Sequence, residues 1–579
     1  IKIDSLERFA PLFQRDEYSA HEEKLLAPFF TNLDRSVYAF LISAPELAGA
    51  LCSRASRAAG DLRWIHLHEF IYPFIRPVRS EKDTDASWEE KVNYGKALEE
   101  FIEFLNAHSM QGVLANPRAR SFYYTWLAQY GDDSIAQMGG MHLGYWGISQ
   151  IAIKHLEDQR IGLAPIEKST RYVNYSAKTG GAYLYYVDPT LREMELDAAY
   201  RGAMDGLFET YSRLIPKMSA WLGARFPEEK KSVIEKKAFD TLRGLLPMAT
   251  LSQVAFFGNG QAFEHLVNRC GAHHLGEIRW AGERAYEELF EVAPSFLRRI
   301  KEEDKRELVE GYQRYLAEKG HRGSPFVREW REEESQKAAA VSNPELPRVR
   351  LIEYDPEGED KVIAGMLYST PNNHLTWDEN IWHARRMSGN KKEEIIAAYL
   401  RGRTQRWQKV GRAFENVYVR FEIEMNNGAW RDLHRHRMLT QQRQYFSCYH
   451  GYDVPSEVDE AGFRREFEEP IKRAEDLFEK IARHDPELAQ YAVALAHRIR
   501  FMQWENLRQS FWQIELRTIP EGHPDYRHIE QEKFRALEKV YPRIARHLRA
   551  NMGEYDFARR GQDERIQKKI ESLQSIENQ

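Results

Sequence analysis

Apolar and polar side chains alternate along residues 417–424 of this chain. A period of two predicts a strand with one buried face. Asn426-Asn427-Gly428 follows as a turn signal. The row His434-Arg435-His436-Arg437 comes next, and the pattern places it at the start of a helix. Because a helix start offers free backbone N–H groups and the positive end of the helix dipole, such a row suits an anion.

The order of elements around this row occurs twice. A strand is expected to begin at Val349, followed by helix, strand, turn, charged row and long helices. The first half of the chain has the same order, with Asp158-Gln159-Arg160 in the place of the row. A period of about half the chain indicates an internal duplication rather than a solenoid. Residues 326–347 have the composition of a linker, so we expect domains at residues 1–325 and 348–579.

Three further stretches are expected to be helical from apolar residues at helical spacing. They are residues 1–60, which include the apolar run Val37 to Ile42, the stretch from Ser87 to His108, and residues 195–320. Ser87 and Glu90 fit a capping box at the start of the second stretch.

Composition narrows the functional classes. The 579 residues are 42% hydrophobic and 30% charged, as in a globular protein. The net charge is −5, so no overall basic field points to nucleic acid, and an anionic small molecule needs a local basic site. The three cysteines are isolated, which argues against a disulfide framework or a metal site and favours a reducing, cytoplasmic location. We see no signal peptide and no apolar run of membrane-spanning length, so no membrane association is expected.

Arg435-His436-Arg437, placed after a strand and a turn, resembles the signature of the flavin-dependent thymidylate synthases. Glu415, 20 residues before Arg435, matches a glutamate of that family. The family's second element, Ser-x-Arg-Tyr, is missing after the row. It is present in the first half as Ser169-Thr170-Arg171-Tyr172.

A third block of the family consists of Arg-x-x-Leu-Pro, Asn-x-Arg and a later arginine, which we expect along one long helix and the next. Arg243 supplies the first arginine, and the second half has Gln490 at that position. Asn506 and Arg508 keep the Asn-x-Arg pair in the second half. Arg517 lies in register with the family arginine that polarises the uracil ring.

Each half therefore keeps what the other lacks. The first half has the serine loop and Arg243, whereas the second half has the basic row and Arg517. We expect one chain to supply both sides of a composite site and the remaining pseudo-symmetric sites to be inactive. Asp158 supports the second expectation, because a carboxylate repels phosphate.

The resemblance implies an α+β fold with two tandem thymidylate-synthase-complementing-protein-like domains, each a small antiparallel sheet flanked by long helices. It implies reductive methylation of dUMP to dTMP, with FAD as cofactor and with NADPH and methylene-tetrahydrofolate as co-substrates. It assigns flavin binding to Arg435, His436, Arg437, Glu415, Asn506 and Arg508, nucleotide binding to Ser169, Thr170, Arg171, Tyr172 and Arg243, and the catalytic role to Arg517.

Two other functions stay open from the sequence. One is a related flavoenzyme that acts on another pyrimidine nucleotide, since Asp432 stands where the family usually has glutamine. The other is a non-catalytic protein that binds flavin or nucleotide. In either case, two fused copies predict a homodimer that resembles the tetramer of the family.

Overall fold

Two compact units make up the chain. The computed structural model describes residues 5–42, 44–81, 83–109, 116–122, 136–159, 161–301, 306–319, 329–330 and 346–557. Unit 1 comprises Ile1–Met218, Phe239–Ser342 and Glu457–Ala494, and unit 2 comprises Ser219–Ala238, Asn343–Ser456 and Leu495–Gln579. Each unit thus includes a segment from the other half of the sequence. The expected linker 326–347 lies outside the described residues apart from 329–330 and 346–347, and the expected domain boundaries stay predictions.

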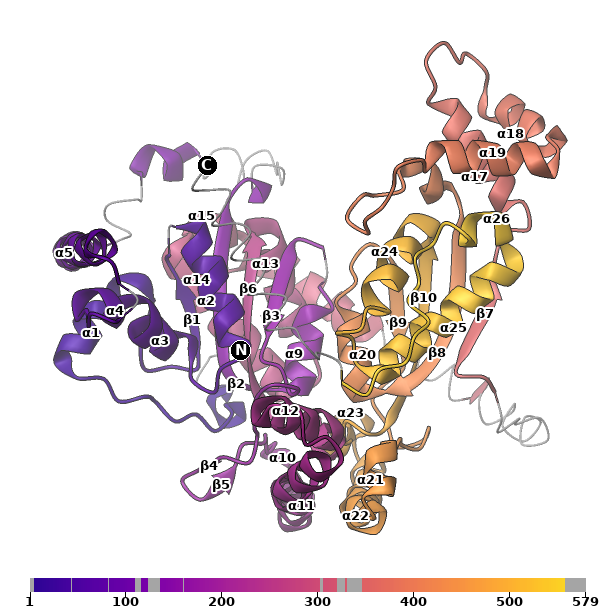
Figure 1. Ribbon diagram of the computed structural model, residues 1–579. Helices are drawn as coiled ribbons and strands as arrows, with labels where there is room; N and C mark the ends of the chain where they lie inside the picture. Colours follow the sequence, from indigo (N-terminus) through magenta and orange to yellow (C-terminus); the bar gives the residue numbers. More distant parts are fainter. Residues whose placement is uncertain are drawn as a thin grey trace. The chain divides into compact units, whose positions relative to one another are not determined.

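Unit 1 contains an antiparallel sheet of order β1-β2-β6-β3 (Figure 1). Its strands are β1 (Val37–Phe40), β2 (Gly140–Ser149), β6 (Leu251–Asn259) and β3 (Leu163–Glu167), and a small hairpin joins β4 (Lys178–Thr179) to β5 (Ala182–Tyr183). Two of these strands, β1 and β6, lie where the apolar spacing predicted helix, so that prediction is wrong there. A short, largely apolar run fits a buried strand and a buried helix equally well, and the pairing of these runs with β2 selects the strand.

The helices of unit 1 flank this sheet or extend from it. Those that come before or directly after the sheet strands are η2 (Glu7–Phe9), α1 (Ala20–Leu26), η3 (Ala27–Phe29), α2 (Pro45–Ala55), α3 (Leu62–Ile65), the π-helix η4 (His66–Ile71), α4 (Tyr72–Ile75), α5 (Asp85–His108), α9 (Gln150–Glu157), α10 (Thr190–Glu193), η5 (Arg243–Leu245), α13 (Gly260–Gly271), α14 (Gly276–Val292), α15 (Pro294–Leu297) and η6 (Arg298–Ile300). The later segment adds α22 (Arg464–Ala482), α23 (Pro486–Ala489) and η9 (Gln490–Ala492), while α11 (Asp197–Arg225), α12 (Lys231–Leu242) and α21 (Ser456–Glu460) have residues in both units.

Unit 2 repeats the sheet of unit 1, with the antiparallel order β7-β8-β10-β9. The strands are β7 (Val349–Glu353), β8 (Tyr418–Asn426), β10 (Arg498–Asn506) and β9 (Thr440–Arg443). The helices are α17 (Gly358–Tyr368), α18 (Trp377–Arg386), α19 (Gly389–Tyr399), η8 (Arg412–Asn416), α20 (Asn427–His434), α24 (Leu507–Arg517), α25 (Pro524–Val540) and α26 (Pro542–Ala545). The predicted strand start at Val349 and the alternating strand before Asn426 are confirmed, and the alternate apolar residues of β8 are buried.

The two sheets share their register as well as their order. Ser149 pairs with Leu251 between β2 and β6, and Asn426 pairs with Arg498 at the same place between β8 and β10. Because β6 and β10 are both nine residues long and each is followed directly by a helix, the two halves can be compared position by position. The fold is therefore α+β, with two related domains in tandem.

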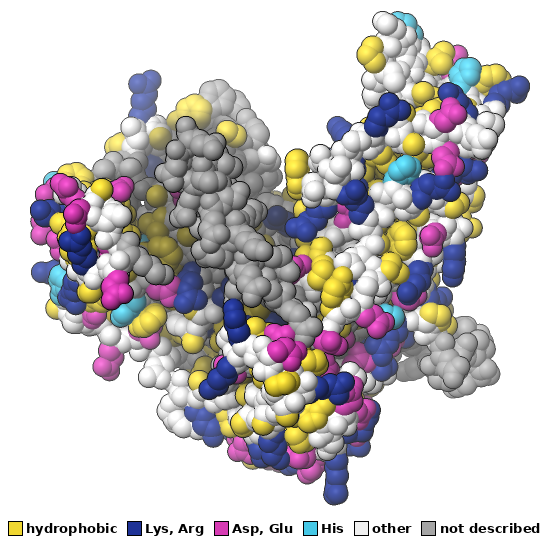
Figure 2. All heavy atoms as spheres, viewed as in Figure 1, with side chains coloured by type: hydrophobic (Ala, Val, Ile, Leu, Met, Phe, Trp, Pro, Cys, Tyr) yellow, Lys and Arg dark blue, Asp and Glu magenta, His cyan; other side chains and the backbone are white. Residues whose placement is uncertain are grey.

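The helix caps repeat too. Asn259 is the last residue of β6 and Asn506 is the last residue of β10. Their side-chain oxygens accept from the backbone N–H groups of Ala262 at 2.8 Å and Gln509 at 2.9 Å. Such asparagine caps stabilise a helix by satisfying an otherwise unpaired N–H group. Charged side chains of both signs are interspersed over the visible surface (Figure 2). No helix in the described part of the chain combines the length and the apolar character needed to span a membrane.

Candidate functional site

The basic row lies at the end of a helix rather than at its start. β8 passes directly into α20, and the side chain of Asn426 caps that helix by accepting from Ala429 N at 2.9 Å. The helix ends at His434, and Arg435 is its C-cap. The expected anion site on free N–H groups at a helix start is therefore wrong. Positive side chains at a C-terminus instead complement the negative end of the dipole.

Within the row, His436 points inward and its two arginine neighbours point outward. His436 is only 5% exposed, whereas Arg435 and Arg437 are exposed. Arg517, the last residue of α24, has its Nε atom 2.9 Å from His436 Nε2. Gln509, from the first turns of the same helix, lies 3.2 Å from His436 Nδ1. The structure thus brings the predicted residues His436 and Arg517 into direct contact.

His436 is neutral in this setting. Burial lowers the pKa of His436 well below its ordinary value, and the charges of Arg517 and Lys533 lower it further, against an opposing effect of Asp432. Asp432 lies 3.8 Å from Arg435 and 3.9 Å from Arg517. This carboxylate therefore faces both guanidinium groups.

Glu415 and Arg508 form an ion pair with each other. Burial raises the pKa of Glu415, but hydrogen bonds from Arg508 and Arg412 outweigh this effect and hold the pKa below its ordinary value. Asn506 uses its side-chain oxygen as the cap of α24, and its side-chain nitrogen is a donor of the kind that a cofactor carbonyl accepts. These three residues stay candidates for flavin binding.

In unit 1, the Ser-x-Arg-Tyr loop follows β3 directly. Ser169 Oγ accepts from the backbone N–H group of Arg171 at 3.2 Å, and Thr170 is 2% exposed. The preceding residue, Lys168, is buried beside the ring of Trp146, and burial lowers its pKa to about 7. The loop therefore begins with a lysine whose charge is weakly held at neutral pH.

Asp240 joins the two predicted nucleotide-binding arginines. Arg171 Nε donates to both oxygens of Asp240 at 3.0 Å, and Arg243 Nε lies 3.5 Å from Asp240 Oδ1. Arg171 and Arg243 are 8% and 4% exposed. The structure thus brings both arginines to one carboxylate. Arg243 lies on the short η5 and is followed by the strand β6, so the long helix expected for its block is wrong there. Asp240 was missed in the sequence, although its spacing of three residues from Arg243 on a helical stretch was a usable signal.

The two halves have different residues at the positions where each half lacks a motif residue of the other. Arg243 is the first residue of η5 and Gln490 is the first residue of η9, so these two positions correspond. His436 corresponds to Gln159, and the Oε1 atom of Gln159 accepts from Arg269 Nη1 at 3.1 Å. The neighbouring Arg160 lies outside the described residues. A guanidinium thus meets the central residue of the row in both halves, from positions that differ by one residue.

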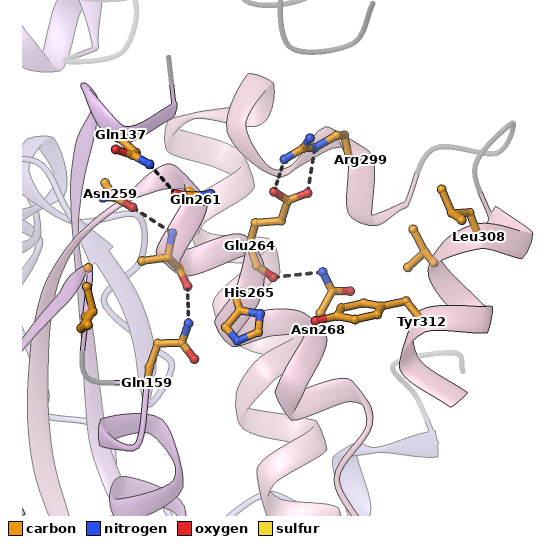
Figure 3. Close-up of a pocket in the computed structure, with 14 residues that line it drawn as sticks. Gln137, Gln159, Asn259, Gln261, Glu264, His265, Asn268, Arg299, Leu308 and Tyr312 are labelled. Atoms are coloured by element: carbon orange, nitrogen blue, oxygen red, sulfur yellow. Dashed lines mark hydrogen bonds and ion pairs between the residues drawn. The ribbon is translucent and has the colours of Figure 1, made fainter. Parts of the chain in front are cut away.

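A cavity of about 760 Å³ lies around Gln159 in unit 1 (Figure 3). Its lining includes Gln261, which corresponds to Arg508, and is rich in side-chain amides. Its charged residues Glu264 and Arg299 form an ion pair with each other. Beside Gln159, the first-half counterpart of His436, the cavity therefore presents mostly neutral polar groups, in contrast to the exposed arginines next to His436.

Serine-loop residues and the basic row belong to different units. The composite site that the reciprocal losses predict concerns how these units meet, and it stays a prediction. No group of three or more metal-binding side chains occurs within the ranges that the structure describes.

Comparisons with known proteins cover most of the chain. The family model described as "Thymidylate synthase complementing protein" matches residues 80–295 and 350–543, which include every candidate site residue. A UPF0159 protein of Chlamydia pneumoniae is 34% identical over 539 residues, which cover 92% of this chain and 94% of the relative. A UPF0159 protein of Thermoplasma acidophilum is 29% identical over 475 residues, 76% of this chain and 91% of the relative. A flavin-dependent thymidylate synthase of Mycobacterium sp. (strain JLS) is 26% identical over 216 residues, 36% of this chain and 82% of the relative.

Proposed function

Because the chain belongs to the thymidylate synthase complementing protein family, we propose that it is a flavin-dependent enzyme that methylates dUMP to dTMP. FAD is the proposed cofactor, with NADPH as reductant and methylene-tetrahydrofolate as carbon donor. A homodimer in the cytoplasm is part of the proposal. The observation that carries it is the neutral, buried His436 in contact with Arg517, between two exposed arginines.

The donors of unit 2 fit a flavin nucleotide. Arg435 and Arg437 provide exposed guanidinium groups, which suit the oxygens of a diphosphate by charge-assisted hydrogen bonds. His436 supplies a neutral ring that is fixed from behind by Gln509. Bound flavin would supply the reducing equivalents, and the protein's part is to bind and orient.

Arg517 has the role that the chemistry most requires. Methylation at C5 of uracil develops charge on the pyrimidine oxygens, and a guanidinium held against the ring lowers the cost of that charge. Its partly buried position, with a side-chain exposure of 15%, strengthens such an interaction. Nucleotide binding is assigned to Ser169, Thr170, Arg171, Tyr172 and Arg243, with Asp240 as the group that holds Arg171 and Arg243 until phosphate arrives.

The test is complementation of a thymidine auxotroph. We expect the wild-type chain and the Arg269→Ala variant to restore growth, and the Arg517→Ala variant to fail at equal expression. Arg269 is the matched control because it makes the corresponding contact in the first half. Growth that is equal with Arg517→Ala and wild type would refute the role of Arg517. Failure of a wild-type protein that binds flavin would refute dUMP as the substrate.

One observation favours a second candidate. Asp432 lies within 4 Å of both Arg435 and Arg517, at 3.8 and 3.9 Å. A carboxylate accepts from an N–H or amino group, which glutamine at this position also does but without charge. A flavoenzyme for a pyrimidine nucleotide other than dUMP is therefore the alternative, and it predicts that a different nucleotide protects the protein from thermal unfolding.

A further inference from the structure

Unit 2 contains a layer of polar side chains where its fold calls for apolar ones. Alternate residues of β10 face the helices, and two of them, Gln503 and Glu505, are completely buried. Further buried polar residues come from α24 and α25: Gln509, Ser510, Gln513, Glu530 and Lys533. Buried polar and charged groups are costly unless they satisfy one another.

The first half shows that the fold does not need this layer. The residues at the seven corresponding positions are Phe256, Gly258, Ala262, Phe263, Leu266, Gly282 and Ala285. None of them has a polar side chain. At these seven positions, polar side chains occur in the half that has His436 and not in the other half. The polar layer is therefore connected with His436 rather than with the fold.

Hydrogen bonds run through the layer from Lys533 towards His436. Lys533 Nζ lies 2.9 Å from Gln503 Oε1 and 2.9 Å from Glu505 Oε2. Gln513 donates from Nε2 to the same Gln503 oxygen at 3.0 Å and to Glu530 at 2.6 Å. Gln509 Nε2 donates to Gln513 Oε1 at 3.2 Å and lies 3.2 Å from His436 Nδ1.

The donor and acceptor of each hydrogen bond follow from Lys533, which lies at one end of this series of bonds. A lysine ammonium can only donate, so the Gln503 atom that it meets is the amide oxygen. The Gln513 atom that meets this oxygen must then be its nitrogen, since two amide oxygens at 3.0 Å would repel each other. The Gln513 oxygen is therefore turned towards Gln509, which must present its own nitrogen both to Gln513 and to His436. Amide orientations are normally inferred from such networks, and here Lys533 fixes them all.

We propose that this chain of buried hydrogen bonds holds His436 as the tautomer with its proton on Nε2, so that His436 offers a donor to the ligand site. Nδ1 must accept from Gln509, and a neutral imidazole has one acceptor and one donor nitrogen. Gln503, Gln509, Gln513 and Lys533 are positioning residues in this account.

This tautomer also affects the contact between His436 and Arg517. The Nε–H group of Arg517 faces His436 Nε2 at 2.9 Å, yet a protonated Nε2 cannot accept it. Gln509 is held by its hydrogen bond to Gln513, whereas Arg517 has a long, flexible side chain with Asp432 nearby at 3.9 Å. Arg517 is therefore the partner that turns away, towards an incoming group. With the His436 N–H group, it makes a pair of donors that suits an acceptor-only oxygen, such as a ring carbonyl or a phosphate. This choice of ligand group rests on the proposed function, but the tautomer does not.

The test is nitrogen magnetic resonance on the full chain labelled with δ1-¹⁵N-histidine. The His436 signal is identified as the one lost in the His436→Gln variant. We expect an unprotonated, pyridine-type Nδ1 in the wild-type protein. A protonated, pyrrole-type Nδ1 would overturn the proposal. Flavin content is measured on the same sample, so that an absent flavin counts against the proposed function alone, and the opposite tautomer counts against this inference alone.

Two variants separate positioning from general stability. Gln513→Leu introduces the first-half residue and interrupts the series of hydrogen bonds between Lys533 and His436. The Gln509 amide can then turn over and accept from His436, and the Nδ1 signal should become pyrrole-type. Ser510→Ala removes a buried hydrogen bond of 2.8 Å to Glu505 that does not lead to His436, and the signal should stay pyridine-type. If both variants change the signal equally, or neither does, the buried hydrogen bonds do not set the tautomer of His436. Should Gln513→Leu fail to fold, Gln509→Glu provides the same test, because a carboxylate at this position can only accept and makes Nδ1 a donor.

Discussion

Arg517 Nε and His436 Nε2 lie 2.9 Å apart, although these residues are separated by 81 positions in the sequence. The contact joins the end of α24 to the residue that follows the C-cap of α20. In the first half, Arg269 and Gln159 meet at 3.1 Å in the corresponding place. Both halves thus place a guanidinium against the central residue of the row, from positions that differ by one residue, and that central residue has changed.

Arg517→Ala should reduce turnover about 10²-fold or more, as loss of a donor to developing negative charge does in other enzymes. Substrate affinity should fall less, because the ring charge develops only in the transition state. Steady-state kinetics with dUMP provide the measurement, and Arg269→Ala is the matched variant. Equal losses in the two variants would mean that neither arginine meets the ring.

Asp240→Asn should strengthen nucleotide binding, because it removes the carboxylate that competes with phosphate for Arg171 and Arg243. Arg171→Ala should weaken binding by about 1.5–3 kcal/mol, the contribution of a hydrogen bond to a charged group. Titration calorimetry with dUMP measures both effects. If the three residues form only a structural ion cluster, both variants would lower stability and leave the affinity unchanged.

Stability should fall as the pH is lowered below about 6.5, and His436 should account for part of the fall. Its pKa is depressed in the folded chain, so below the ordinary value the unfolded chain binds the additional proton and is favoured. The slope from one such group is at most about 1.4 kcal/mol per pH unit. His436→Gln introduces the first-half residue and should flatten the dependence between pH 6.5 and 5, as measured by urea unfolding. An unchanged slope would show that His436 is not kept neutral by the fold.

Lys533→Ala should destabilise the chain by about 3–5 kcal/mol, because it leaves Glu505 and Glu530 as buried carboxyl groups without their cation. The additional change Glu505→Gln should recover part of this loss by removing one of the unpaired charges. Chemical denaturation measures both variants. Additive losses in the double variant would contradict the coupling of these residues in one network.

A homodimer is the expected assembly, since closed two-fold symmetry is the commonest arrangement for such chains. Sedimentation should give twice the 68.0 kDa mass of one chain. A monomer or a tetramer would contradict this expectation.

The sequence predicted the elements whose pattern is purely local. The strand ending at Asn426 and the helix ending at His108 follow from periodicity, although the cap of that helix is Thr84 and not Ser87. The prediction from the sequence was wrong at β1, because the apolar run Val37–Phe40 has no periodicity that distinguishes a strand from a helix. The direct passage from β8 into α20 was missed for a similar reason, since Asn426 serves as a cap as readily as in a turn.

The candidate site was predictable as a set of residues but not as a set of contacts. Motifs identified His436 and Arg517 separately, and only the packing of α20 against its neighbours shows that they touch. Asp240 and the buried layer around Lys533 carry no family motif. Polar residues at buried strand positions are visible in the sequence only once the register of β10 is known.

The central claim is that unit 2 carries the flavin site, and the flavin content of purified variants tests it most directly. The double variant His436→Ala/Arg437→Ala is compared with the wild type and with the first-half double variant Gln159→Ala/Arg269→Ala, by absorbance after unfolding releases the cofactor. We expect full flavin occupancy in the wild type and in the first-half variant, and loss of flavin in the second-half variant with its fold intact. Full occupancy in the second-half variant, or loss only in the first-half variant, would contradict the account.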